Sequence, residues 1–201
     1  MLLGLPARSA VNIPGLSAEI MQRLKPHLQL AETVGLLVSQ LAGGHVKELE
    51  LRLQGEFAHH PSQPLVIASL KGLLSAALGD SINFVNASLE AKARGIQVLE
   101  VKDESSRDFA GGSLQITTRG DQGSRSVTGA VFADDELRIT SIDEFPVTVS
   151  PSRHMLFTRH RDMPGIIGRL GSMLGEHNVN IASMQVGRKI CLLYTSPSPR
   201  D

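Results

Sequence analysis

The side chains best suited to chemistry lie near the C-terminal end of the chain, between a predicted strand and a predicted helix. The loop reads His160-Arg-Asp162-Met-Pro-Gly165, and Asn180 begins the strand predicted after the helix. Amides at a helix start can hold a carboxylate, Asp162 can neutralise an ammonium group, and Asn180 offers both a donor and an acceptor. His160 can take either role, and Gly165 allows close approach of the backbone. These groups suit a small zwitterion; the alternative is that Asp162 only caps the helix and His160 is a solvated loop residue.

Motifs for other chemistries are missing from the sequence. It contains neither a Gly-x-Gly-x-x-Gly fingerprint nor a Walker loop, and Gly165, Gly168 and Gly171 have the spacing of helix packing. The seven histidines have no metal-ligand spacing, and we expect His59 and His60 to form a solvated loop rather than a zinc site. We therefore predict no catalytic, cofactor-binding or metal-binding residue in this chain.

The composition argues against several classes of partner. The chain has 201 residues, in which 20 Lys and Arg balance 20 Asp and Glu. A net charge of zero argues against nucleic-acid binding and against attraction to anionic membranes. No apolar run approaches the roughly 18 residues that a membrane span needs. A single cysteine cannot form an internal disulfide, so the predicted compartment is the reducing cytoplasm.

In the first part of the chain, hydrophobic residues are spaced first as in helices and then as in a strand. Residues 13–42 predict two helices, because Pro26 interrupts a leucine repeat of four residues. Residues 48–54 alternate apolar and polar side chains and predict a strand with one wet face. A helix over 64–78 and a shorter one near 85–93 follow.

The next part is expected to form an antiparallel β region. Strands are predicted over four segments, which are residues 96–101, 113–118, 126–132 and 137–142. Pro146 and Pro151 then bracket a linker. Together with the preceding strand and helices, this pattern predicts an α+β domain with an antiparallel sheet.

Beyond the linker the pattern is strand, helix, strand. The strands are predicted over 154–158 and 179–186, and the helix begins after Pro164. A β–α–β unit of three elements leaves one sheet face and at least one edge uncovered, so this unit is unfinished.

Both ends of the sequence differ from the rest. Residues 191–201 hold the only Cys and the only Tyr. They resemble a translated sequencing-library adapter, and we treat them as a foreign tail. The opening Leu2-Leu-Gly-Leu-Pro6 reads as the end of a helix stopped by Gly and Pro, which indicates a helix that began upstream.

Several strings together resemble a known family. His160-Arg-Asp-Met-Pro-Gly-Ile-Ile167, followed by Asn178-Val-Asn-Ile-Ala182, resembles the opening β–α–β of an ACT domain, the amino-acid-sensing regulatory module. Other strings resemble the C-terminal half of the long form of D-3-phosphoglycerate dehydrogenase: Ala10-Val-Asn-Ile-Pro-Gly15, the helix over 28–41, Asn86-Ala…Arg94-Gly95 and Val127-Thr-Gly-Ala-Val131. The resemblance covers residues 2–190 and is closest to cyanobacterial forms.

The resemblance implies a domain organisation and a truncated ferredoxin-like ACT unit. The implied segments are a remnant of the catalytic-domain exit at 1–12, a helical connector of the intervening domain at 13–44, the intervening (allosteric substrate-binding) domain at 45–150, a truncated ACT domain at 152–190 and the foreign tail at 191–201.

The resemblance also implies a function. The family's enzyme oxidises 3-phosphoglycerate with NAD in the first step of L-serine biosynthesis, and its ACT domains pair in a homo-oligomer to bind L-serine as feedback inhibitor. Carried over, His160, Asp162 and Asn180 fall where the family's serine contacts lie, with Gly165 in the same loop. The family's NAD-binding and catalytic residues would precede Met1, so the chain alone is expected to bind no NAD and to be inactive.

Some members of the family bind an anion in the intervening domain. Arg138 and Arg153 are candidates for such a site by charge and position. The alternative is that both are solvated surface arginines.

Two functions from other classes stay open. One is a freestanding amino-acid-binding regulator of the ACT type, which would need a complete module. The other is the regulatory part of an iron–sulphur L-serine dehydratase, which uses a similar domain pair; the string over 10–15 argues against it.

Overall fold

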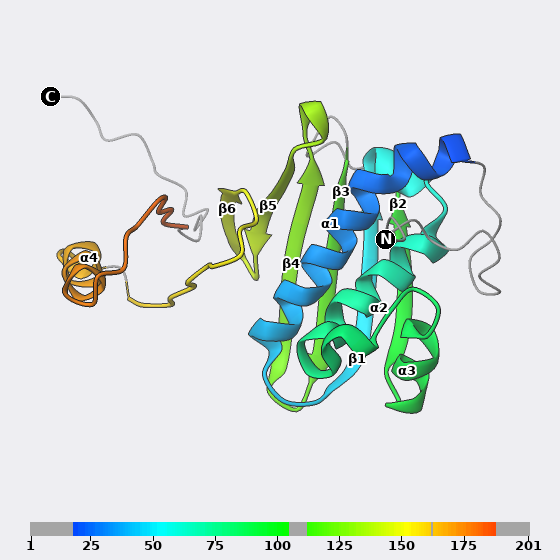
Figure 1. Cartoon of the computed structure of the whole chain (residues 1–201), viewed down its shortest axis with the longest axis horizontal. Helices are drawn as coiled ribbons and strands as arrows, with labels where there is room; N and C mark the ends of the chain where they lie inside the picture. The colour runs from blue at the N-terminus through cyan, green and yellow to red at the C-terminus, as the bar shows by residue number, and fades with distance from the viewer. Residues whose placement is uncertain (1–17, 105–111, 162, 188–201) are drawn as a thin grey trace, which may run out of the picture.

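The computed structural model describes residues 18–104, 112–161 and 163–187. The helices are α1 (Ala18–Ala42), α2 (Ser62–Leu78), α3 (Ala87–Ala93) and α4 (Ile166–Glu176). The strands are β1 (Val46–Gln54), β2 (Gln97–Asp103), β3 (Ser113–Gly120), β4 (Gly123–Val131), β5 (Leu137–Ile142) and β6 (Phe145–Val149). Helices α1 and α2 cover one face of a six-stranded sheet, and α4 stands apart from it (Figure 1). The α+β class is confirmed, and no helix in the described ranges is long and apolar enough to cross a membrane.

The strand order is β2-β1-β3-β4-β5-β6. Every neighbouring pair is antiparallel except β1 and β2, which run parallel with Leu49 opposite Val98. The prediction of an antiparallel sheet is therefore confirmed for the other pairs and wrong for β2. The reason is that α2 and α3 lie between these two strands in the chain, and a helical crossover returns the chain to the end of the sheet from which it left.

The buried face of the sheet follows the alternation in the sequence. Leu49, Leu51 and Leu53 of β1 are buried, whereas the polar residues between them face the open side. Leu114 and Ile116 of β3 continue the same buried face. The predicted strand with one wet face is confirmed, because side chains on a strand alternate between the two faces.

Helices α1 and α2 touch backbone to backbone. A Cβ on Gly35 would lie 2.3 Å from the carbonyl oxygen of Ser69, and a Cβ on Gly72 would lie 2.0 Å from that of Glu32. Lys71 adds an ion pair across the contact, with Nζ 2.5 Å from Oε1 of Glu32. Only glycine leaves room for this approach, so the two positions determine how closely the helices pack.

Helix α1 runs unbroken through Pro26, so the prediction of two helices is wrong. Pro26 is buried, and Leu24 and Leu30 on either side of it are buried as well. The helix changes direction within its first turns, which is how a helix accommodates a proline ring (Figure 1). Burial of leucine contributes about 1.5–3 kcal/mol a side chain, enough for two of them to offset the roughly 3 kcal/mol cost of an internal proline.

Strand β6 lies where a linker was expected. It pairs with β5, and Pro146 stands opposite Ser141. Proline cannot donate a hydrogen bond to a neighbouring strand, but β6 is the last strand of the sheet, where the missing donor is tolerated.

The predicted β–α–β unit forms only its helix. Helix α4 is present, whereas residues 154–158 and 179–186 form no strand and leave large apolar side chains exposed. Among them Leu156 is 67% exposed and Val186 51%. A helix satisfies its hydrogen bonds internally, but a strand needs a partner, and the described chain supplies none for these two segments.

Two histidines form a packed cluster rather than a solvated loop. The rings of His27 and His60 lie 4.6 Å apart edge to face, and His27 is also 4.6 Å from the ring of the buried Phe57. Nε2 of His60 is buried without a hydrogen-bond partner. The expectation of a solvated loop is therefore wrong for His60 and holds only for the exposed His59.

We predict that Gly72→Ala destabilises the sheet domain by about 1–3 kcal/mol, because the added methyl group collides with the backbone of α1. Urea unfolding followed by circular dichroism measures the change. The matched control is Gly171→Ala in α4, where nothing lies within 4 Å of the new Cβ, and which should leave the stability of the sheet domain unchanged. A Gly72→Ala protein as stable as the parent would show that the helices can separate freely.

We predict that His60 makes the fold sensitive to acid. Burial lowers the pKa of His60 below its ordinary 6.5, although Glu56 opposes the shift and His59 and Lys102 support it. The unfolded chain then binds more protons than the folded chain below pH 6.5, so the free energy of unfolding falls as the pH drops through that value.

In His60→Phe, which keeps a ring against His27, unfolding midpoints measured from pH 8 to 5 should depend less on pH than in the parent. His59→Gln is the control and should keep the parent's pH dependence. Equal pH dependence in the parent and His60→Phe would contradict the prediction.

Candidate functional site

Two of the predicted effector residues, Gly165 and Asn180, lie at opposite ends of α4. Gly165 precedes the helix with φ of 86°, a left-handed conformation that suits glycine. Asn180 follows the other end, where the amide of Val179 donates to the carbonyl of Leu174 and closes the helix. The 11 residues of α4, at about 1.5 Å a residue, separate these ends by roughly 16 Å. One copy of the chain therefore does not bring Gly165 and Asn180 around a small ligand.

The remaining residues of this set do not complete a pocket. His160 is exposed, and its Nδ1 lies 2.9 Å from the carbonyl oxygen of Arg161. Asp162 lies outside the described residues. The predicted capping of α4 by Asp162 consequently stays a prediction.

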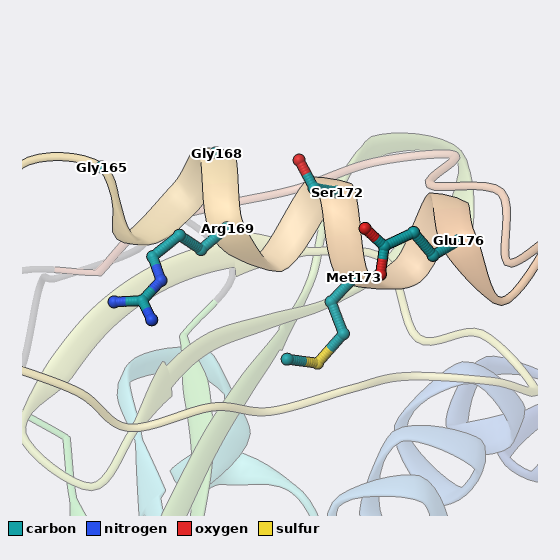
Figure 2. A pocket seen from close by; sticks show the side chains of 6 residues that line it. All are labelled: Gly165, Gly168, Arg169, Ser172, Met173 and Glu176. Carbon is teal, nitrogen blue, oxygen red and sulfur yellow. The ribbon is translucent and has the colours of Figure 1, made fainter.

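A shallow groove follows one side of α4. It has a volume of roughly 470 Å³ and begins at Gly165, where the missing side chains of Gly165 and Gly168 leave it open. Arg169 and Met173 project along the same side of the helix (Figure 2). Gly168 and Gly171 have nothing within 4 Å of a Cβ position, so the predicted packing against another element is not made in the described chain.

The two arginines proposed for an anion site have different surroundings. Arg138 on β5 donates two hydrogen bonds of 2.8 Å to Glu136, and its guanidinium lies 5.9 Å from the ring of Phe132. The same hydrogen bonding lowers the pKa of Glu136. Arg153 is exposed in the segment after β6. Because Arg138 is already neutralised by a carboxylate of its own strand region, an anion would have to compete with Glu136.

A polar depression on the open face of the sheet was not predicted. Strands β3 and β4 and the turn between β5 and β6 line it, with Arg125 and Arg159 as its cations. The guanidinium of Arg125 already has partners within the protein, because it lies 3.9 Å from Asp143 and donates a hydrogen bond to the carbonyl of Leu41. The alternating Ser, Thr and Gln of β3 and β4 are the signal that could have indicated a polar face.

The same open face carries a chain of ion pairs. Arg119 on β3 pairs with Glu48 and Glu50 of β1, and Arg52 pairs with Glu50 at 2.9 Å. The hydrogen bond from Arg52 is the largest cause that lowers the pKa of Glu50. Each carboxylate is matched by a cation across the strands, so the network ties β1 to β3.

We next consider metal ligands and the turn after β1 in the described part of the chain. No group of three or more His, Cys, Asp or Glu there could hold a metal ion. The parallel pair β1 and β2 has helices between its strands, the arrangement in which a dinucleotide-binding turn follows the first strand. Here that turn contains Phe57 and Ala58, both buried in the hydrophobic core, and it has no Gly-x-Gly-x-x-Gly sequence.

The sequence matches two family models and several known proteins. Residues 23–143 match the family model of the D-3-phosphoglycerate dehydrogenase intervening domain, and residues 154–191 match that of the ACT domain. A D-3-phosphoglycerate dehydrogenase of Synechocystis sp. is 60% identical over 191 residues, which are 94% of this chain and 34% of that protein. Proteins of the same name from Methanocaldococcus jannaschii and Bacillus subtilis are 39% and 34% identical, over 94% and 92% of this chain and 36% and 35% of their own length.

The chain thus spans about a third of the length of the curated relatives it matches. The relatives bear out the resemblance seen in the sequence, including its cyanobacterial character. Because the intervening-domain match covers most of the chain and the ACT match follows it, the chain belongs to the D-3-phosphoglycerate dehydrogenase family.

Proposed function

We propose that this chain is the regulatory part of a long-form D-3-phosphoglycerate dehydrogenase, which oxidises 3-phosphoglycerate in the first step of L-serine biosynthesis. The observation that carries the proposal is the order of the two family matches, the intervening domain followed by the ACT domain. We assign residues 13–44 and 45–150 to the intervening domain and 152–190 to the ACT unit. Neither alternative function, a freestanding regulator or part of a serine dehydratase, is favoured by the names of the relatives.

In this proposal NAD serves the longer enzyme and is not bound by this chain. The lack of a Gly-x-Gly-x-x-Gly fingerprint in the sequence supports that division. The described residues then supply regulation, and the longer enzyme supplies hydride transfer. The cytoplasm, inferred from the single cysteine, remains the proposed compartment.

The proposed effector is L-serine, bound by His160, Asp162, Gly165 and Asn180. The carboxylate would meet the amides at the start of α4, and the ammonium group would meet Asp162. Asn180 lies at the opposite end of α4, so a serine that contacts both ends needs Asn180 from a second copy of the chain. This separation supports a homo-oligomer in which ACT units pair.

We predict that the purified chain does not reduce NAD in the presence of 3-phosphoglycerate. When residues 2–190 replace the matching third of the Synechocystis relative, the chimera should regain that activity, measured as NADH absorbance. Activity of the isolated chain above a mock preparation would contradict the division of roles. A folded chimera without activity would contradict the assignment of the chain to this enzyme.

We predict that Asn180→Ala in the same chimera weakens inhibition by L-serine about tenfold, because one hydrogen bond to a charged ligand contributes about 1.5–3 kcal/mol. The activity without serine should not change. Gln97→Ala, on the exposed edge of β2, is the control and should leave the inhibition unchanged. The isolated chain should bind serine more weakly than millimolar by calorimetry, since its two ACT strands are unpaired. Serine inhibition that is equal in the chimera and its Asn180→Ala variant would remove Asn180 from the site.

A further inference from the structure

The segment that follows α4 returns to the sheet at the outer edge of β6 (Figure 1). Strand β6 is the last in the strand order, so the described chain offers no further strand on that side. The backbone N–H of Thr148 points to this edge and donates to Oε1 of Gln185 over 2.7 Å. The side chain of Gln185 thereby supplies the acceptor that a neighbouring strand would otherwise provide.

Gly187 makes the contact close. A Cβ at Gly187 would lie 2.9 Å from the carbonyl oxygen of Pro146, 3.1 Å from Cγ1 of Val147 and 3.3 Å from Cβ of Phe145. The backbone at Gly187 therefore lies directly on β6, and a larger residue would push the segment away. Gly187 is half-buried here, whereas the exposed glycines of α4 have open space around them.

Two residues of the segment contact β6: Gln185 through its side-chain oxygen and Gly187 through its backbone. The neighbouring side chains of Met184 and Val186 are 43% and 51% exposed and make no comparable contact in the described chain. The other side of β6 is held by β5, and Val147 and Val149 pack against the hydrophobic core.

We propose that the outer edge of β6 is the docking edge that joins the ACT unit to the intervening domain, and that Gln185 and Gly187 are the residues that dock. The edge is reached from Asn180 by five residues, at most about 17 Å of extended chain. A serine bound at Asn180 would therefore lie within that length of chain from β6. This last step rests on the proposed function, whereas the docking contact itself does not.

The test is amide hydrogen exchange measured by NMR on the full 201-residue chain, without NAD or serine. In Gln185→Ala and Gly187→Val the amide of Thr148 should exchange about five- to tenfold faster than in the parent, since an exposed hydrogen bond contributes about 1 kcal/mol. Gln185→Glu keeps the accepting oxygen and should keep the slow exchange. Gly171→Ala, in open space on α4, is the control and should change nothing at Thr148.

The amide of Ile116, in the centre of β3, reports whether the sheet stays folded and should exchange at the parent rate in every variant. Gln185 is exposed, so Gln185→Ala should fold like the parent. If Gly187→Val does not fold, the result for Gln185→Ala alone tests the proposal. Exchange at Thr148 that is the same in the parent and in Gln185→Ala would overturn the proposal. The result is independent of catalysis and of serine binding, so it distinguishes failure of the docking edge from failure of the proposed function.

Discussion

The close backbone contact between α1 and α2 fixes the packing of the whole sheet domain. Gly35 and Gly72 allow each helix to lie against the carbonyl groups of the other. Gly129 on β4 allows a similarly close contact between the sheet and α1, because a Cβ there would lie 2.7 Å from Cδ1 of Leu30 on α1. Three small residues therefore set the distance between the helix pair and the strands. The apolar side chains of β1 and β3 can fill the remaining space at the density of a protein interior only at that distance.

The C-terminal unit shows what happens when a module lacks its strand partners. Helix α4 forms because its hydrogen bonds are local, whereas the two flanking segments stay unpaired. Exposed apolar side chains such as Leu156 and Val186 mark the surface that pairing would bury. The described end of the unit contacts the edge of β6 through Gln185 and Gly187, and Arg159 of the same unit lines the depression on β3 and β4.

The elements with a clear period could be predicted from the sequence, and the errors arise where tertiary contacts outweigh local preference. Pro26 predicts a break, but burial of the neighbouring leucines carries α1 through it. Pro146 predicts a linker, but an edge strand tolerates proline. The direction of β2 and the pairing of 154–158 and 179–186 are not local properties at all, since they depend on which strand lies alongside. The candidate residues were identified by type, and their separation by a helix already follows from the predicted order of strand, helix and strand.

The class of the fold, the positions of most helices and strands, and the family can all be predicted from the residues alone, because they depend on hydrophobic period and on strings of residues. The parallel pairing of β1 and β2 and the packing of His60 against His27 emerge only once the chain is folded. The same holds for the contact between Gln185 and Thr148. Each of these is a contact or a distance between residues far apart in the chain, and no local pattern of side chains encodes how far apart two such residues finally lie.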